Sequence, residues 1–242
     1  MIFLADIGNT RIKFAQAGSV TEPPSVVSVN TPQVLVNAVK AARTELCVIS
    51  SVVPLRTREL ENELERAGVK FHVVNASSPF PFPVRYKTPW SLGSDRLVSV
   101  TGAYALDTGF SEYIITIDFG TATTVNILSR PEGFLGGVIA PGVEMMTHAL
   151  HEKTAKLPLV TLEGFENKIG DDTESSLQAG VLNATLGLIE KVTGMLKGSF
   201  AVYYTGGNAH FIKAHLPDEY FHVPDLQFFG LRELAARLLD KN

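Results

Sequence analysis

Apolar positions along the chain form two kinds of pattern: short continuous runs, which are typical of strands, and helical spacing. In each half of the chain, short runs come first and segments with helical spacing follow. The first half opens with three short apolar runs separated by turn residues, which predict strands at residues 1–7, 10–16 and 24–30. Apolar residues at helical spacing follow, interrupted by further strand-like runs. These predict helix 31–43, strand 46–50, helix 54–68, strand 70–75, a proline-rich loop at 77–90 and helix 94–106.

The second half begins again with three strand-like runs. EYIITID, TTVNILS and FLGGVIA predict strands at 112–118, 123–129 and 134–140. The later elements are predicted as helices 142–152 and 174–197, strand 201–205, helix 208–216, strand 219–223 and helix 226–240. The order strand, strand, strand, helix, strand, helix thus occurs twice, as in a duplicated ribonuclease-H-like unit. We expect an α/β protein of two such domains, residues 1–111 and 112–242, each a mixed sheet with three leading strands flanked by helices.

Composition narrows the classes of protein that need to be considered. The chain is 45% apolar and 19% charged, as in an ordinary soluble globule, and its net charge of −4 argues against a nucleic-acid partner. No uncharged apolar stretch reaches the roughly 18 residues of a membrane span, and Asp6 interrupts the first apolar run too early for a signal peptide. The single cysteine, Cys47, excludes an internal disulfide and is expected to be a buried structural thiol. We therefore expect a cytoplasmic protein that binds neither nucleic acid nor membrane.

A short acidic turn appears in both halves at corresponding places. FLADIGNTRIKF, at residues 3–14, and IDFGTATTVN, at 117–126, each place Asp, one apolar residue and Gly after an apolar strand. The glycine lets a ligand approach the backbone, and the following Asn or Thr residues offer amide and hydroxyl donors for phosphate oxygens. Asp6 and Asp118 each add a carboxylate, which can bind Mg²⁺ or another hard cation.

One such turn alone is weak support for a ligand site, because Asp-Gly and Gly-Asn turns are common in hairpins. Two copies at equivalent places in two similar halves favour a functional interpretation. We expect the two turns to face one cleft and to hold a nucleoside triphosphate and its metal between them. The chemistry of the residues alone does not decide whether Asp118 prefers K⁺ or Mg²⁺.

Five motifs occur together in an order that resembles a known family. They are DIGNTRIK at 6–13, GSDR at 93–96, DFGTATT at 118–124, GGVIAPG at 136–142 and TGG at 205–207. The chain resembles the sugar kinase, actin and heat-shock chaperone ATPase superfamily, and within it the type III pantothenate kinases. The similarity runs from residue 3 to about residue 207. Ser94 is one departure, since the family pattern favours Ala, Pro or Val between the glycine and the aspartate.

The resemblance implies an enzyme that uses ATP to phosphorylate the primary hydroxyl of pantothenate, giving 4'-phosphopantothenate in the first step of coenzyme A biosynthesis. It further implies a homodimer, Mg-ATP as the phosphoryl donor and a requirement for K⁺ or NH₄⁺. Asp95 matches the general base of the family, and Arg96 would neutralise the carboxylate of pantothenate. Two other readings stay open: Asp95 could simply interact with the dipole of its helix, and Arg96 could form a surface ion pair.

The remaining site residues are also carried over from the resemblance. Asp6 would hold Mg²⁺ through water, and Asp118 would bind the monovalent cation. Lys13 could meet a phosphate as a point charge. Gly206 and Gly207 would allow the adenosine to approach the end of a strand. The ATP contacts are Asp6, Ile7, Gly8, Asn9, Thr10, Arg11, Ile12, Lys13 and Thr121. The substrate contacts are Tyr86, Gly93, Ser94, Asp95, Arg96 and Thr173.

Several of these assignments have structural alternatives. Tyr86 follows a proline-rich loop and could be a packing residue. The resemblance implies a substrate contact of Thr173 across the dimer, but Thr173 or its neighbour Asp172 could instead cap the helix that follows. His148 and His151 have the spacing of a metal pair, but no third ligand follows at a sensible spacing, so we interpret them as surface or interface residues.

Two rival functions come from other classes. One is a catalytically silent nucleotide-binding regulator of the same fold, which would have no need for the Asp95 base. The other is an ATPase that uses nucleotide to drive closure, but such chains are longer and carry extra subdomains. The sequence does not distinguish pantothenate from a close pantetheine-like analogue.

Overall fold

The computed structural model describes residues 1–17, 25–29, 31–42, 44–109, 111–165 and 169–240. The chain forms two compact units. The first consists of Met1–Gly109, Leu128–Leu135 and Asp225–Asn242, and the second of Phe110–Ile127 and Gly136–Pro224. The first change of unit lies close to the expected boundary at residues 111 and 112, but two later segments return to the first unit. The two-domain boundary therefore stays a prediction.

The first unit is built on a five-stranded mixed sheet with the strand order β3-β2-β1-β4-β5. Strands β1 and β2 are antiparallel, as are β2 and β3, while β1, β4 and β5 run parallel. Its elements are β1 (Ile2–Ile7), β2 (Ile12–Ala17), β3 (Ser25–Val29), α1 (Pro32–Ala41), β4 (Leu46–Ser51), α2 (Pro54–Arg66), β5 (Phe71–Val73), a 3₁₀ turn (Pro89–Ser91), α3 (Ser94–Leu106) and α7 (Leu226–Leu239).

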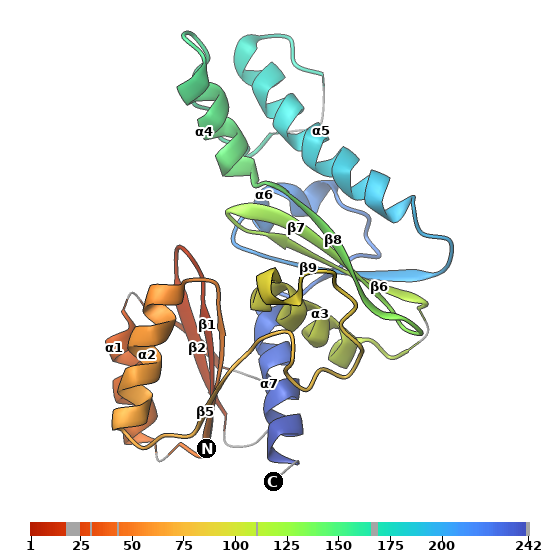
Figure 1. Cartoon of the computed structure of the whole chain (residues 1–242). Coiled ribbons are helices and arrows are strands. Elements are labelled where there is room, and N and C mark those ends of the chain that lie inside the picture. The colour runs from red at the N-terminus through yellow and green to blue at the C-terminus, as the bar shows by residue number, and fades with distance from the viewer. Residues whose placement is uncertain (18–24, 30, 43, 110, 166–168, 241–242) are drawn as a thin grey trace. The chain divides into compact units, whose positions relative to one another are not determined.

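Helices cover both faces of this sheet because its central strands carry apolar side chains on both sides. On one face, Phe3 and Ile49 pack in a cluster with Leu35 of α1 and Leu60 of α2. On the other face, Leu4 and Val48 pack in a cluster with Val98 of α3 and several residues of α7. Figure 1 shows α1 and α2 together on one side of β1 and β2, with α7 on the other. Helix α3 is thereby fixed against the sheet.

The second unit repeats the plan with the strand order β10-β9-β6-β7-β8, in which β6, β9 and β10 run parallel. Its elements are β6 (Tyr113–Phe119), β7 (Ala122–Ser129), β8 (Gly133–Pro141), α4 (Val143–Lys153), α5 (Thr173–Thr193), β9 (Phe200–Thr205), α6 (Ala209–Ile212), a 3₁₀ turn (Lys213–His215) and β10 (Phe221–His222). The far ends of β7 and β8, residues 128–135, belong to the first unit.

The two sheets confirm the expected duplicated fold. In each, the first three strands of the unit occupy one side and the two later parallel strands the other, so each sheet reads 3-2-1-4-5 in the order of its own strands. Figure 1 shows α4 and α5 side by side in the second unit.

Some predicted element boundaries are wrong, and the chain shows why. Helix α5 ends at Thr193 instead of residue 197 because Gly194 forms its C-cap. The predicted helix 208–216 is a single turn of α-helix followed by a 3₁₀ turn that stops before Pro217. The predicted strand 219–223 is reduced to Phe221–His222, and Pro224 follows closely. Of the predicted elements 24–30 and 31–43, residues 24, 30 and 43 lie outside the described residues.

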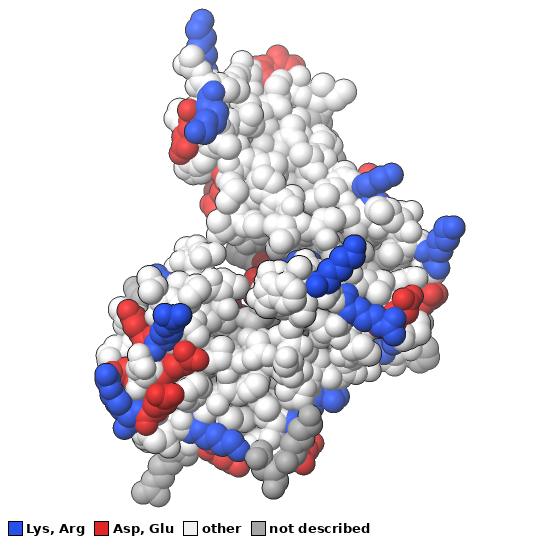
Figure 2. Space-filling model, viewed as in Figure 1, with Lys and Arg blue, Asp and Glu red and all other residues white. Residues whose placement is uncertain are grey.

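Two surface properties bear on function. In the described part of the chain, no helix is both long and apolar enough to cross a membrane. On the face seen in Figure 2, acidic and basic side chains are interspersed over the region of α2, where Glu63 pairs with both Lys40 and Arg66.

Cys47 is fully buried in β4, and burial raises the pKa of its thiol to about 12, so the predicted structural thiol is confirmed.

Candidate functional site

The first acidic turn lies at the carboxyl ends of the parallel strands β1 and β4. Asp6 is half-buried near the end of β1, and its register partners are Lys13 of β2 and Ser50 of β4. The turn between β1 and β2 is closed by the amide of Gly8, which donates to the carbonyl of Arg11 at 3.0 Å. Its outer residues are exposed: Asn9, Thr10 and Arg11. In open α/β sheets this edge is the usual place for ligands.

Lys13 has a specific partner within the first unit. Its ammonium nitrogen lies 3.3 Å from Oδ1 of Asp225, the residue at the start of α7. Both side chains are a little over one third exposed, so the pair contributes little to stability. The Lys13 ammonium group, which we predict to contact phosphate, is thus held near the end of β1 by the carboxylate of Asp225.

Helix α3 begins at the same edge of the first sheet. Ser94, its first residue, is buried, and its hydroxyl lies 3.2 Å from Oγ of Ser50. The same oxygen accepts the backbone N–H of Ser51 at 3.1 Å and lies 3.1 Å from the Ser51 carbonyl oxygen. Because Ser50 and Ser51 end β4, the motif GSDR sits one strand away from Asp6. The side chain of Ser94 faces β4, so the predicted substrate contact of this residue could involve only its backbone.

Asp95 follows at the second position of α3, and its carboxylate bends back onto the first turn. Oδ1 accepts the backbone N–H of Arg96 at 2.9 Å. A β-carbon on Gly93 would lie 2.4 Å from the same oxygen, so glycine at this position leaves room for the carboxylate. Burial raises the pKa of Asp95, while the Arg96 N–H and the Arg96 charge lower it by less. The carboxyl is therefore biased toward accepting a proton, as a general base requires.

Arg96 is buried rather than exposed, so the alternative of a surface ion pair is wrong. Its guanidinium carbon lies 5.9 Å from the ring centre of Tyr86 and 5.9 Å from that of Phe134. The two rings are 6.2 Å apart. The structure thus brings the predicted residues Tyr86 and Arg96 together and adds Phe134, which sequence reasoning missed. Nothing in the run FLGG distinguishes Phe134 from an ordinary strand residue.

Two backbone segments of the second unit hold its acidic turn in place. Asp118 lies half-buried near the end of β6, and Gly120 and Thr121 form the turn to β7. The amide of Gly142 donates to the Thr121 carbonyl at 3.0 Å, and a β-carbon on Gly142 would lie 2.4 Å from the carbonyl oxygen of Gly120. This explains the glycine that ends the GGVIAPG motif.

The TGG motif secures the turn from the other side. Gly206 has φ +106°, and a β-carbon there would lie 2.5 Å from the backbone of Phe119. Asn208 donates from its amide to the Phe119 carbonyl at 2.9 Å and from its side chain to the Gly120 carbonyl at 3.3 Å. These contacts explain how the motif holds the turn. The adenosine contact of Gly206 and Gly207 stays a prediction.

The two acidic turns are similar in sequence but differ in form. The first connects its strands through residues 8–11, and the second only through Gly120 and Thr121. In the second turn, the Gly120 amide donates to the Ala122 carbonyl at 3.2 Å. Asp6 lies in the first unit and Asp118 in the second. A common ligand for both turns stays a prediction.

Thr173 is the first residue of α5 and is exposed. The helix is capped by Asp172, whose carboxylate accepts the Ser175 amide at 2.8 Å, and the Ser175 hydroxyl accepts the Asp172 amide at 3.2 Å. Because Asp172 forms the cap, the hydroxyl of Thr173 is not required for it. The predicted substrate contact of Thr173 therefore stays a prediction that does not compete with the capping interpretation.

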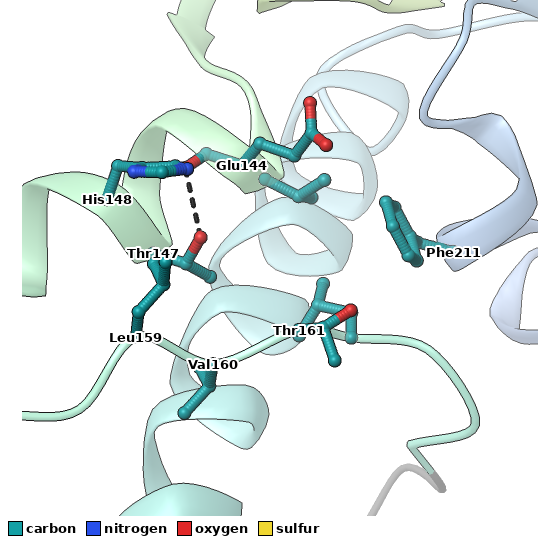
Figure 3. A pocket seen from close by; sticks show the side chains of 9 residues that line it. Glu144, Thr147, His148, Leu159, Val160, Thr161 and Phe211 are labelled. Atoms are coloured by element: carbon teal, nitrogen blue, oxygen red, sulfur yellow. Dashed lines mark hydrogen bonds between the residues drawn. The ribbon is translucent and has the colours of Figure 1, made fainter.

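Each unit contains a cavity next to these elements. In the first, a cavity of about 800 Å³ is lined by the end of β4, the start of α2, Trp90, Gly93 and Ser94. In the second, a cavity of about 320 Å³ lies between α4, residues 159–162 and Phe211. In Figure 3, Glu144, Thr147 and His148 project from α4, and Phe211 stands on the other side of the cavity.

The described residues contain no group of three or more His, Cys, Asp or Glu side chains that could hold a metal ion. A ring nitrogen of His151 lies 2.8 Å from the Leu157 carbonyl oxygen. A Mg²⁺ ion that is bound mainly by nucleotide phosphates needs only one or two carboxylates and keeps several waters. Asp6, at the edge of β1, fits that role as a single carboxylate.

Comparison with known proteins agrees with this arrangement. The family profile described as type III pantothenate kinase matches residues 2–194. A type III pantothenate kinase of Phenylobacterium zucineum is 36% identical over 79% of this chain and 75% of its own length. That of Flavobacterium psychrophilum is 33% identical over 91% of this chain and 92% of its own.

A solved structure from Campylobacter jejuni, described as a conserved putative Baf family transcriptional activator, has a TM-score of 0.65. The match covers 98% of this chain and 99% of that one at 22% identity, so it shows the fold alone. The profile and the two relatives, by contrast, extend over most of the sequence that carries the five motifs. On these findings the chain belongs to the type III pantothenate kinase family.

Proposed function

We propose that this protein transfers the γ-phosphoryl group of ATP to the primary hydroxyl of pantothenate, forming 4'-phosphopantothenate and ADP, the first step toward coenzyme A. The observation that carries the proposal is the first turn of α3. There a carboxylate with a raised pKa is held beside a buried guanidinium that is flanked by Tyr86. A base and a cation next to each other suit a substrate that carries both a hydroxyl and a carboxylate.

Residues of α3 bind and activate pantothenate, the phosphoryl acceptor. Asp95 takes the proton of the hydroxyl as its oxygen bonds to the γ-phosphorus, and the bond from that phosphorus to the bridging oxygen of ADP breaks. Arg96 neutralises the pantothenate carboxylate. Cation–π interactions with Tyr86 and Phe134, whose ring centres lie 5.9 Å from the guanidinium carbon, hold the Arg96 side chain in position.

The two acidic turns bind ATP, the phosphoryl donor, and its cations. The exposed residues of the first turn and the ammonium group of Lys13 contact the phosphates, and Thr121 of the second turn supplies a further contact. Asp6 would hold Mg²⁺ through water, and the ion would neutralise charge on the phosphates when bound. Asp118 binds a monovalent cation, K⁺ or NH₄⁺, together with backbone carbonyls.

The proposal includes a homodimer in the cytoplasm, where ATP is available. Support for the dimer comes from large apolar side chains that the second unit exposes. They include Ile139, Met145, Leu150, Leu159 and Ile169. In this dimer Thr173 contacts the substrate held by the neighbouring subunit.

A coupled assay of ADP release tests the function. Purified protein is given ATP, Mg²⁺ and K⁺, with and without pantothenate, and with pantetheine as the competing acceptor. We expect ADP release that depends on pantothenate and a mass increase of one phosphate on the product. The Asp95→Asn variant should lose about 10²–10⁴-fold in turnover while keeping its fold and its nucleotide binding.

The same assay separates the alternatives. ADP release without any acceptor would indicate an ATPase, and nucleotide binding with no turnover would indicate a silent regulator. If pantetheine is used in preference to pantothenate, the role of Arg96 toward a carboxylate is wrong. Asp95→Asn activity within about tenfold of wild type would remove Asp95 from the role of base.

A further inference from the structure

We propose that Ser94 is a positioning residue, whose buried hydroxyl fixes the first turn of α3 to the end of β4 and thereby holds the Asp95 carboxylate in place. The inference rests on the proposed function, because it concerns how the base of that reaction is oriented.

The three contacts of the Ser94 hydroxyl are consistent with one arrangement of protons. A serine hydroxyl can donate one hydrogen bond and accept two. The Ser51 N–H must donate to Ser94 Oγ, and the Ser51 carbonyl can only accept the Ser94 proton. Ser50 then donates its own proton to Ser94 Oγ across 3.2 Å. All three contacts are satisfied at once, and both hydroxyls are buried away from water.

The strand end that holds Ser94 is itself fixed. Ser51 Oγ accepts the Val53 amide at 3.2 Å and lies 2.6 Å from the hydroxyl of Thr57 in α2. Ile7 of β1 is the register partner of Ser51, and its carbonyl accepts the Val52 amide at 3.2 Å. Ser94 therefore connects α3 to a rigid corner formed by β1, β4 and α2.

The two neighbours of Ser94 in the sequence do not tie the helix start to β4 in the same way. Gly93 occupies the N-cap position and offers no side chain to cap the helix. Asp95 turns its carboxylate back to the Arg96 N–H, which fixes it relative to the helix but not relative to the sheet. Ser94 connects the helix start to Ser50 and Ser51 of β4, and Ser50 is the register partner of Asp6.

Ser99 offers a matched control on the same helix. It is buried to a similar degree, 2% exposed against 4% for Ser94, and its hydroxyl has no hydrogen-bond partner in the described part of the chain. Both Ser94→Ala and Ser99→Ala delete one buried oxygen from α3, but only the first removes contacts to β4.

The test compares wild type with Ser94→Ala, Ser94→Thr and Ser99→Ala, using kcat, KM for ATP and hydrogen exchange of the backbone amides at residues 94–97. We expect kcat of Ser94→Ala to fall about tenfold to a hundredfold, because a displacement of about 1 Å at a reacting group can cost about 10²-fold. KM for ATP should not change, since its contacts lie on other elements. Exchange at 94–97 should become faster. Ser94→Thr, which keeps the hydroxyl, should recover most of kcat, and Ser99→Ala should match wild type in all three.

The outcomes are separable. If Ser94→Ala keeps kcat within about twofold of wild type, or if Ser99→Ala loses as much, the positioning role is overturned. A lower melting temperature with unchanged kcat below it would show that Ser94 is merely structural and overturn it as well. If wild type does not phosphorylate pantothenate, the proposed function fails. The amide exchange then still decides whether Ser94 anchors the helix, and unchanged exchange in Ser94→Ala would overturn that too.

Discussion

A β-carbon on Gly93 would lie 2.4 Å from Oδ1 of Asp95, closer than two non-bonded atoms can approach. The glycine therefore reserves the space that the carboxylate occupies. We predict that Gly93→Ala displaces Asp95 and lowers kcat by about 10²-fold, as expected for a misplaced reacting group. Steady-state kinetics with saturating ATP and pantothenate would measure this. Gly187→Ala in α5 is the control, because nothing lies within 4 Å of a β-carbon there. An unchanged kcat for Gly93→Ala would contradict the reserved space.

Burial of Asp95 should make its charge a cost to stability. Its pKa is raised in the folded protein, mainly by desolvation, so the folded state binds more protons than the unfolded state between the ordinary and the raised pKa. Stability then falls as pH rises through that window and stays reduced above it. We predict that Asp95→Asn melts at a higher temperature than wild type at neutral pH, with a difference that shrinks toward pH 4. Thermal unfolding across pH measures it. A lower melting temperature for Asp95→Asn at neutral pH would contradict the assigned burial cost.

The sequence predicts the fold well because the patterns that specify it are local and occur in both halves of the chain. Strand patterns in the same order in both halves are enough to give two sheets of the same topology. Boundaries fail where a short element depends on tertiary pairing, as in β10, whose two residues pair with β9 only. Pro224, which follows closely, also limits the length of that strand.

The site is predicted less completely, because motifs identify backbone turns but not the side chains that pack against them. The glycines of GGVIAPG and TGG suggest ligand contacts, yet in the structure they hold the turn at Gly120 and Thr121. Phe134, which lies 5.9 Å from the Arg96 guanidinium carbon, comes from a strand more than thirty residues away in sequence. The motif GSDR does not reveal the role of the Ser94 hydroxyl, because only the fold shows that it contacts β4.

Lys13 is predicted to act on phosphate rather than on stability. Its pair with Asp225 is more than one third exposed on both sides and should be worth about 0–1 kcal/mol, whereas a charge-assisted bond to phosphate is worth about 1.5–3 kcal/mol. Lys13→Met should therefore raise KM for ATP by about tenfold to a hundredfold with little change in melting temperature. Asp225→Asn, which breaks the same ion pair but keeps the ammonium group, is the control and should leave KM unchanged or lower it. Equal KM values in both variants would remove Lys13 from nucleotide binding.

Asp118 is predicted to make activity depend on a monovalent cation. A single half-buried carboxylate beside a two-residue turn suits a singly charged ion better than a second Mg²⁺, which demands octahedral geometry. Wild type should be active with K⁺ or NH₄⁺ and nearly inactive when Na⁺ or Tris is the only monovalent cation. Asp118→Ala should lose most activity and respond no longer to K⁺. Full wild-type activity in Na⁺ would contradict the assignment.

Thr173 is predicted to complete the site of the neighbouring subunit, and mixed dimers can show this directly. Thr173→Ala and Asp95→Asn chains are each expected to be nearly inactive as homodimers. In a mixed dimer, the site that takes Asp95 from the Thr173→Ala chain receives Thr173 from the other chain and is therefore complete. Co-expression with two different affinity tags isolates this species, and about half of the wild-type activity per dimer should return, because one of two sites is intact.

If Thr173 instead acts within its own chain, each site of the mixed dimer carries one substitution, and activity stays at the level of the Thr173→Ala homodimer. Loss of the helix cap does not explain the result, since the capping box of α5 is formed by Asp172 and Ser175 and does not involve the Thr173 hydroxyl. Comparable melting temperatures for Thr173→Ala and wild type check that point. Sedimentation analysis of the purified mixture checks that it is dimeric, and a monomer with full wild-type activity would contradict both the dimer and the shared site.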